Sequence, residues 1–219
     1  MNRHSIRNIL LFTIFLLLTG CAAMVTDSFM RPTLSNLQRQ TDIDLVCEGS
    51  PTLLLMLDSM LASAPGDKQL LLTATQSFSG YAKVLEECGN PERAIVVSNK
   101  ARIYGLSLLW DHKDLDSITT LPLTELEHLL KNTPRSKVDR LFWAGNGWFS
   151  WIYRQQGSPE SMAQLVRVER IMLRVIELDE TYHHGAAHLF LGAYYGAKPK
   201  LFGGDPEKSR HHFEKALSI

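Results

Sequence analysis

Five histidines near the C-terminal end are the side chains of this sequence best suited to holding a metal ion: His183, His184, His188, His211 and His212. His184 and His188 are four residues apart and would share one face of a helix. The zinc-protease pattern His-Glu-x-x-His is absent, because a glycine follows His184. No cysteine or aspartate at ligand spacing completes a fourth position. The sequence therefore predicts capping and surface histidines, with no metal and no cofactor.

Other patterns of catalytic residues are also missing from the sequence. The acid pairs Glu86-Glu87 and Glu125/Glu127 have no basic or nucleophilic companion in a recognisable order, and neither Gly-x-Ser-x-Gly nor Ser-x-x-Lys occurs. Gly203-Gly204 precedes Asp205, whose carboxylate would itself occupy the free amides of the following helix. We therefore expect a protein that is not an enzyme.

Three tryptophans of one predicted helix, Trp143, Trp148 and Trp151, are separated by small residues that would let other helices approach closely. Two interpretations stay open. The helix belongs to a tightly packed core, or its indoles line an apolar groove that binds a ligand or partner. For the groove, the candidate contacts are Trp143, Asn146, Trp148, His188 and Tyr195.

The N-terminus carries an export signal. Arg3 and Arg7 precede ten mostly apolar residues at 9–18, which are too few to cross a bilayer as a helix. Leu-Thr-Gly-Cys then resembles a bacterial lipobox ending at Cys21. We expect residues 1–20 to be a signal peptide and residues 21–30 a lipidated tether, with two or more acyl chains on Cys21 holding the protein on the periplasmic side of the envelope. Because no aspartate follows Cys21, the outer membrane is favoured.

Export changes the expectation for the other two cysteines. In an oxidising compartment Cys47 and Cys88 form an even pair, which predicts a disulfide. The alternative, two small buried thiols, stays open because spacing in the sequence does not fix distance in space.

Composition and periodicity predict one all-α domain over residues 31–219. Lys plus Arg equals Asp plus Glu at 23 each, and 45% of the residues are hydrophobic, so neither nucleic-acid binding nor disorder is indicated. A polar residue, a proline and an acid recur at three expected helix starts: Asn90-Pro91-Glu92, Ser158-Pro159-Glu160 and Asp205-Pro206-Glu207.

The spacing of aromatic and small residues indicates divergent tetratricopeptide-like repeats. One set runs from Phe78 and Tyr81 to Ala94 and Ala101, and a second from Leu191 to Ala216. Such helical hairpins stack into a solenoid with a concave binding face. The sequence ends inside the second pattern without a capping helix, so we expect the solenoid to be incomplete at its C-terminus. A generic helical bundle is the alternative.

The segment Leu201-Phe-Gly-Gly-Asp-Pro-Glu, together with His188-Leu-Phe-Leu-Gly-Ala-Tyr-Tyr and Trp143-Ala-Gly-Asn-Gly-Trp148, resembles the TatT component family associated with TRAP transporters. The resemblance implies a lipid-anchored periplasmic protein of tetratricopeptide-like helices that forms trimers around a central channel. It implies a role beside the solute-binding subunit of a TRAP transporter, in binding that subunit, an apolar small molecule, or both. The rival expectation is a scaffold lipoprotein that assembles envelope proteins without a small-molecule ligand.

Overall fold

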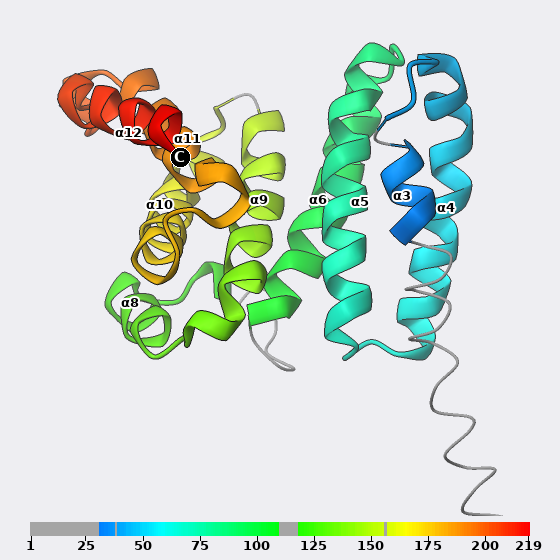
Figure 1. Ribbon diagram of the computed structural model, residues 1–219, viewed down its shortest axis with the longest axis horizontal. Helices are drawn as coiled ribbons and strands as arrows, with labels where there is room; N and C mark the ends of the chain where they lie inside the picture. The colour runs from blue at the N-terminus through cyan, green and yellow to red at the C-terminus, as the bar shows by residue number, and fades with distance from the viewer. Residues whose placement is uncertain (1–30, 38, 110–117, 156) are drawn as a thin grey trace, which may run out of the picture. The chain divides into compact units, whose positions relative to one another are not determined.

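The computed structural model describes residues 31–37, 39–109, 118–155 and 157–219. Within these residues every regular element is a helix and no strand occurs, which confirms the predicted all-α class (Figure 1). The expected signal peptide at 1–20 and the tether at 21–30, with Cys21, lie outside the described residues. The chain divides into two compact units, one ending at Glu48 and the other running from Gly49 to Ile219.

The first unit contains α3 (Arg31–Leu37) and the opening of α4 (Ile43–Ser63). The Oδ1 atom of Asp42 accepts a hydrogen bond from the amide of Leu45 at 3.1 Å, which satisfies one free donor at the start of α4. Pro51 lies inside α4, which begins eight residues earlier at Ile43 and continues through it. A proline in a helix interior removes one N–H, and the rest of the hydrogen-bond ladder carries α4 past it.

The part of α4 in the second unit packs as a core helix. Its leucines at 53, 54, 57 and 61 are buried. Asp58 accepts a hydrogen bond from the Tyr104 hydroxyl at 2.5 Å and pairs with Lys100, and these partners lie on α6 (Pro91–Leu109). Burial, followed by this hydrogen bond, raises the pKa of Tyr104 well above its usual value. Among the described helices α4 alone is long and apolar enough to cross a membrane, as core helices of soluble proteins can also be.

The second unit is a succession of helices. After α4 and before α6 comes α5 (Lys68–Glu87). The helices that follow are α8 (Leu123–Lys131), α9 (Val138–Arg154), α10 (Pro159–Leu178), α11 (Tyr182–Ala197) and α12 (Pro206–Ser218), with 3-10 turns η2 (Arg135–Lys137) and η3 (Lys200–Phe202). Contacts join α5 to α6, α6 to α9, and then each of α9 to α12 to the next helix. This order is compatible with stacked helical hairpins, and the solenoid itself stays a prediction.

Two of the three expected polar caps are confirmed. The Ser158 hydroxyl accepts from the amide of Ser161 at 3.3 Å, and the Asp205 Oδ1 atom accepts from the amides of Glu207 and Lys208, both at 3.1 Å. The third helix, α6, also begins at Pro91 as expected, but the side-chain amide of Asn90 donates to the carbonyl of Cys88 at 2.9 Å.

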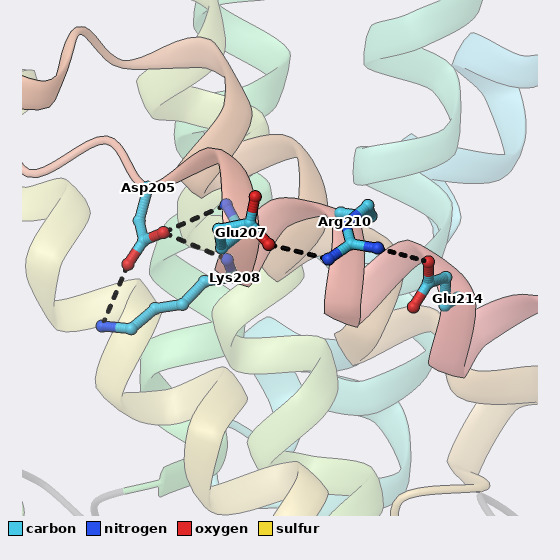
Figure 2. Close-up of polar contacts among 5 residues, drawn as sticks. All are labelled: Asp205, Glu207, Lys208, Arg210 and Glu214. Carbon is cyan, nitrogen blue, oxygen red and sulfur yellow. Dashed lines mark hydrogen bonds and ion pairs between the residues drawn. The ribbon is translucent and has the colours of Figure 1, made fainter.

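Figure 2 shows how the Asp205 cap continues into a line of ion pairs on the surface of α12. Arg210 bridges Glu207 at 2.7 Å and Glu214 at 3.5 Å, one turn to either side. Exposed ion pairs of this kind contribute little net free energy, because both charged groups remain in water. The cap therefore fixes where α12 begins, and the ion pairs add little to its stability.

Glycines on α9 permit its close approach to two neighbouring helices. A Cβ atom added at Gly147 would lie 2.6 Å from the carbonyl oxygen of Ala101 on α6, and one at Gly145 would lie 2.8 Å from Cε of Met172 on α10. At Gly147 the close atom belongs to the backbone of α6, so a larger residue there would push α6 and α9 apart, whereas at Gly145 the flexible end of Met172 could shift instead. The small residues between the tryptophans are therefore packing contacts, as one of the two interpretations of the sequence required.

Candidate functional site

Trp148, a predicted groove residue, lies in the interior of the second unit. Its side chain is fully buried, and its Nε1 atom donates a hydrogen bond to Oε1 of Gln164 on α10 at 2.8 Å. An indole at this position fills the space between α9 and α10, and Gln164 satisfies its one polar atom. The position favours a packing role for Trp148.

Trp143, at the beginning of the same helix, is only partly buried. Its ring meets the edge of Phe142 at a centroid distance of 5.3 Å and that of His183 at 5.5 Å. His183, His184 and Gly185 have the left-handed conformation, with φ of 50°, 57° and 68°, where α11 is kinked. Left-handed backbone is costly for residues with a Cβ atom, and aromatic contacts hold His183 there.

Tyr195 belongs to a buried hydrogen-bond cluster around Glu169 of α10. The hydroxyls of Tyr195 and Tyr194 donate to the two carboxylate oxygens of Glu169 at 2.6 and 2.9 Å. Burial raises the pKa of both tyrosines, and the Glu169 bonds add to this effect. Both hydroxyls therefore stay protonated as donors, which is what a buried carboxylate requires.

His188 of α11 contacts His212 of α12. Their Nδ1 atoms lie 2.9 Å apart, so one ring must donate and the other accept, and the Tyr195 ring stacks on His212 at a centroid distance of 5.8 Å. The Nε2 atom of His188 is buried without a hydrogen-bond partner, 3.9 Å from a carboxylate oxygen of Glu180. Two neutral imidazoles in complementary tautomers fit this geometry.

Both histidines are held in the neutral form. Burial lowers the pKa of His212 to about 4, helped by His188, His211 and Lys208 nearby. Burial also lowers the pKa of His188, while Glu180 opposes the shift and Lys215 adds to it. A proton added to this pair would have to enter a poorly hydrated contact between α11 and α12.

From the histidine pair we predict that the folded protein is less stable in acid than at neutral pH. The unfolded chain takes up a proton on His212 near pH 6.5, whereas the folded chain does so only near 4. The free energy of unfolding should therefore fall as pH drops from about 6.5 to 4, by about 1–2 kcal/mol once residual solvent contact is allowed for. Urea unfolding of His212→Gln at both pH values should show less of this fall. His211→Gln, at the exposed neighbouring position, should retain it, and an equal pH response in all three proteins would contradict the assignment.

The described histidines do not form a metal centre. Among the described residues no group of three or more His, Cys, Asp or Glu side chains is arranged to hold a metal ion. His188 and His212 contact each other instead.

Asn146, the remaining predicted groove residue, lines a cavity of roughly 470 Å³ between α5, α9 and α11. One side of this cavity is aromatic, with the rings of Phe149 and Phe190 meeting edge-on at 4.9 Å. The lining also contains polar and charged residues, among them Arg154. The full lining, which we call the α5–α9–α11 cavity, is Lys83, Glu86, Asn146, Phe149, Ser150, Tyr153, Arg154, Leu189 and Phe190.

Arg154 is the charged residue of this cavity that is withdrawn from water, with 8% of its surface exposed. Its Nη1 atom donates to the carbonyl and hydroxyl oxygens of Ser150 at 2.9 and 3.1 Å, and its Nη2 atom lies 3.3 Å from Oε1 of Glu86 on α5. Its Nε atom is buried without a hydrogen-bond partner. Burial lowers the pKa of Arg154, an effect that Glu86 partly offsets.

The structure thus separates the five predicted contacts. His188 and Tyr195 meet through His212, Trp143 packs near the α11 kink, Trp148 is in the core, and Asn146 lines the cavity.

Sequence reasoning missed Arg154 and Glu169. A signal was present for Glu169, which follows Val168 and precedes Ile171 and Met172 in a buried stripe, where a carboxylate needs donors from another helix.

Consecutive packed helices define the class of this chain as an all-helical protein. Comparison with known proteins makes the assignment specific, because the family model of the TRAP transporter T-component matches residues 39–219. The chain belongs to this family. An uncharacterized protein of Treponema pallidum (strain Nichols) is 26% identical over 192 residues, which cover 80% of this chain and 59% of that protein. The chain therefore spans about three fifths of the length of the curated relative that it matches.

Proposed function

We propose that this chain is a non-enzymatic accessory component of a TRAP-type solute transporter, held by a lipid on Cys21 at the periplasmic side of the cell envelope. It contacts the solute-binding subunit of that transporter. The observation that carries the proposal is the family match over residues 39–219.

A pull-down tests the partner. The mature chain from residue 22 onward, immobilised without lipid, should retain the solute-binding subunit encoded beside a TRAP permease of the same organism, and should not retain an unrelated periplasmic binding protein. Native mass spectrometry of the same sample tests the trimer implied by the family resemblance. Retention of envelope-assembly proteins in place of the solute-binding subunit would favour the scaffold alternative and contradict the proposal.

The lipid anchor has its own test. In a double-membraned host the full chain should partition into detergent and co-sediment with outer membranes, because two acyl chains bind a bilayer stably where one does not. Cys21→Ser should release the protein into the soluble periplasmic fraction. An unchanged distribution of Cys21→Ser would contradict lipidation at this residue.

We also propose that Cys47 and Cys88 form a disulfide in the exported protein, as export into an oxidising compartment favours. Alkylation of the unreduced mature domain should modify neither cysteine, and reduction should expose both. Reduction should lower the free energy of unfolding by about 2–4 kcal/mol. Cys47→Ser with Cys88→Ser should show the same lower stability with and without reductant, and two reactive thiols before reduction would refute the bond.

A further inference from the structure

We propose that the α5–α9–α11 cavity binds a small amphiphile with a single anionic head group. The head pairs with Arg154 in the position that the Glu86 carboxylate occupies, and the apolar body lies against Phe149 and Phe190. This inference rests on the proposed function as a binding component and deepens it by naming a class of ligand.

The first argument is the state of Arg154. A guanidinium is always charged in proteins, and withdrawing it from water is costly unless its donors are paired. Ser150 and Glu86 engage the two terminal nitrogens of Arg154, while its Nε atom is buried with no hydrogen-bond partner. A carboxylate bound through two oxygens matches two neighbouring N–H groups of a guanidinium. Arg154 therefore has capacity for an anion beyond the bonds that it makes within the chain.

The second argument is that Glu86 is an exchangeable partner. Its side chain is 43% exposed and approaches Arg154 only to 3.3 Å, from the last turn of α5. Partly exposed ion pairs contribute little net free energy, so an incoming anion can displace this carboxylate into water at small cost. Glu86 then acts as an internal substitute for the head group of the ligand.

The third argument is the shape and composition of the cavity. Its volume of roughly 470 Å³ suits a small organic molecule. Leu189 and Tyr153 on the rim are 49% and 64% exposed, so an apolar body bound there would remove hydrophobic surface from water. Lys83 adds a second cation to the lining. Once Glu86 has moved away, two cations and an aromatic wall face one ligand.

Isothermal titration of the mature chain with 4-phenylbutyrate, and with its neutral analogue 4-phenyl-1-butanol, tests this inference. The acid should bind about tenfold more tightly than the alcohol, because only the acid can pair with Arg154. Glu86→Gln should strengthen binding of the acid about threefold to tenfold, by removing the competing carboxylate, and should leave the alcohol unchanged. Glu87→Gln, at an exposed position outside the cavity lining, is the matched control and should change neither affinity.

Arg154→Gln should abolish the preference for the acid. Lys83→Gln should reduce it about twofold to threefold, and this exposed substitution serves if Arg154→Gln does not fold. Equal binding of acid and alcohol, binding of neither, or weaker binding of the acid to Glu86→Gln would each overturn the inference. Tight binding of the acid without retention of the solute-binding subunit would instead refute the proposed partner and leave the cavity assignment intact.

Discussion

Replacing Trp148 by alanine is expected to lower the free energy of unfolding by about 3–5 kcal/mol, the range for deleting a large buried aromatic side chain. Trp148 has no exposed surface and lies in the core formed by α9, α10 and neighbouring helices. Its removal would also leave Gln164, which is itself buried, without the indole donor at 2.8 Å. Urea unfolding followed by circular dichroism measures the change without relying on tryptophan fluorescence.

Trp143→Ala is the matched control for this prediction, because Trp143 is on the same helix and is only partly buried. Its substitution should cost about 1–2 kcal/mol, since less apolar surface returns to water. If Trp148→Ala cost less than Trp143→Ala, the indole of Trp148 would not be a core group, and the groove interpretation would regain support.

Gly147→Ala is expected to destabilise the chain by about 2–3 kcal/mol, a large effect for one methyl group. The added Cβ atom would lie 2.6 Å from the carbonyl oxygen of Ala101 and 3.0 Å from Cγ2 of Thr75. The oxygen belongs to the backbone of α6, so relief requires α6 and α9 to move apart and lose their packing. Thermal and urea unfolding of the purified variant would both report the loss.

Gly80→Ala provides a control with the opposite sign. Gly80 is exposed in the middle of α5, and a Cβ atom there would meet nothing within 4 Å. Alanine has the higher helix propensity, so Gly80→Ala should stabilise the protein by about 0.5–1 kcal/mol. If Gly147→Ala and Gly80→Ala changed the free energy of unfolding by similar amounts, α6 and α9 would be farther apart at Gly147 than the 2.6 Å contact implies.

The acid sensitivity and the cavity inference involve different parts of α11. The histidine pair contacts α12, whereas Leu189 and Phe190 line the α5–α9–α11 cavity. Substitutions at His212 should therefore change stability at low pH without removing the preference for an anionic ligand, and Glu86→Gln should do the reverse. The two sets of variants separate a packing effect from a binding effect.

Local patterns in the sequence determined the class of fold and several of the positions at which helices begin. The proline-preceding caps Ser158 and Asp205 start helices as expected, because a side-chain oxygen bonding an amide two or three residues on needs no distant partner. The all-α class followed from periodicity, which each helix carries in its own residues. α6 likewise begins at Pro91 as expected, but the side chain of Asn90 donates to the carbonyl of Cys88, because a side-chain amide can bond a neighbouring carbonyl instead of the helix.

Tertiary structure alone decided which polar and aromatic residues meet. No sequence pattern pairs His188 with His212 or Glu169 with Tyr195, because these partners are 24 and 26 residues apart on different helices. It also could not distinguish a tryptophan that lines a groove from one that fills the core, since both need the same small neighbours. Spacing along one helix fixes only the direction in which a side chain points, whereas burial and charge environment depend on the helix that packs opposite it.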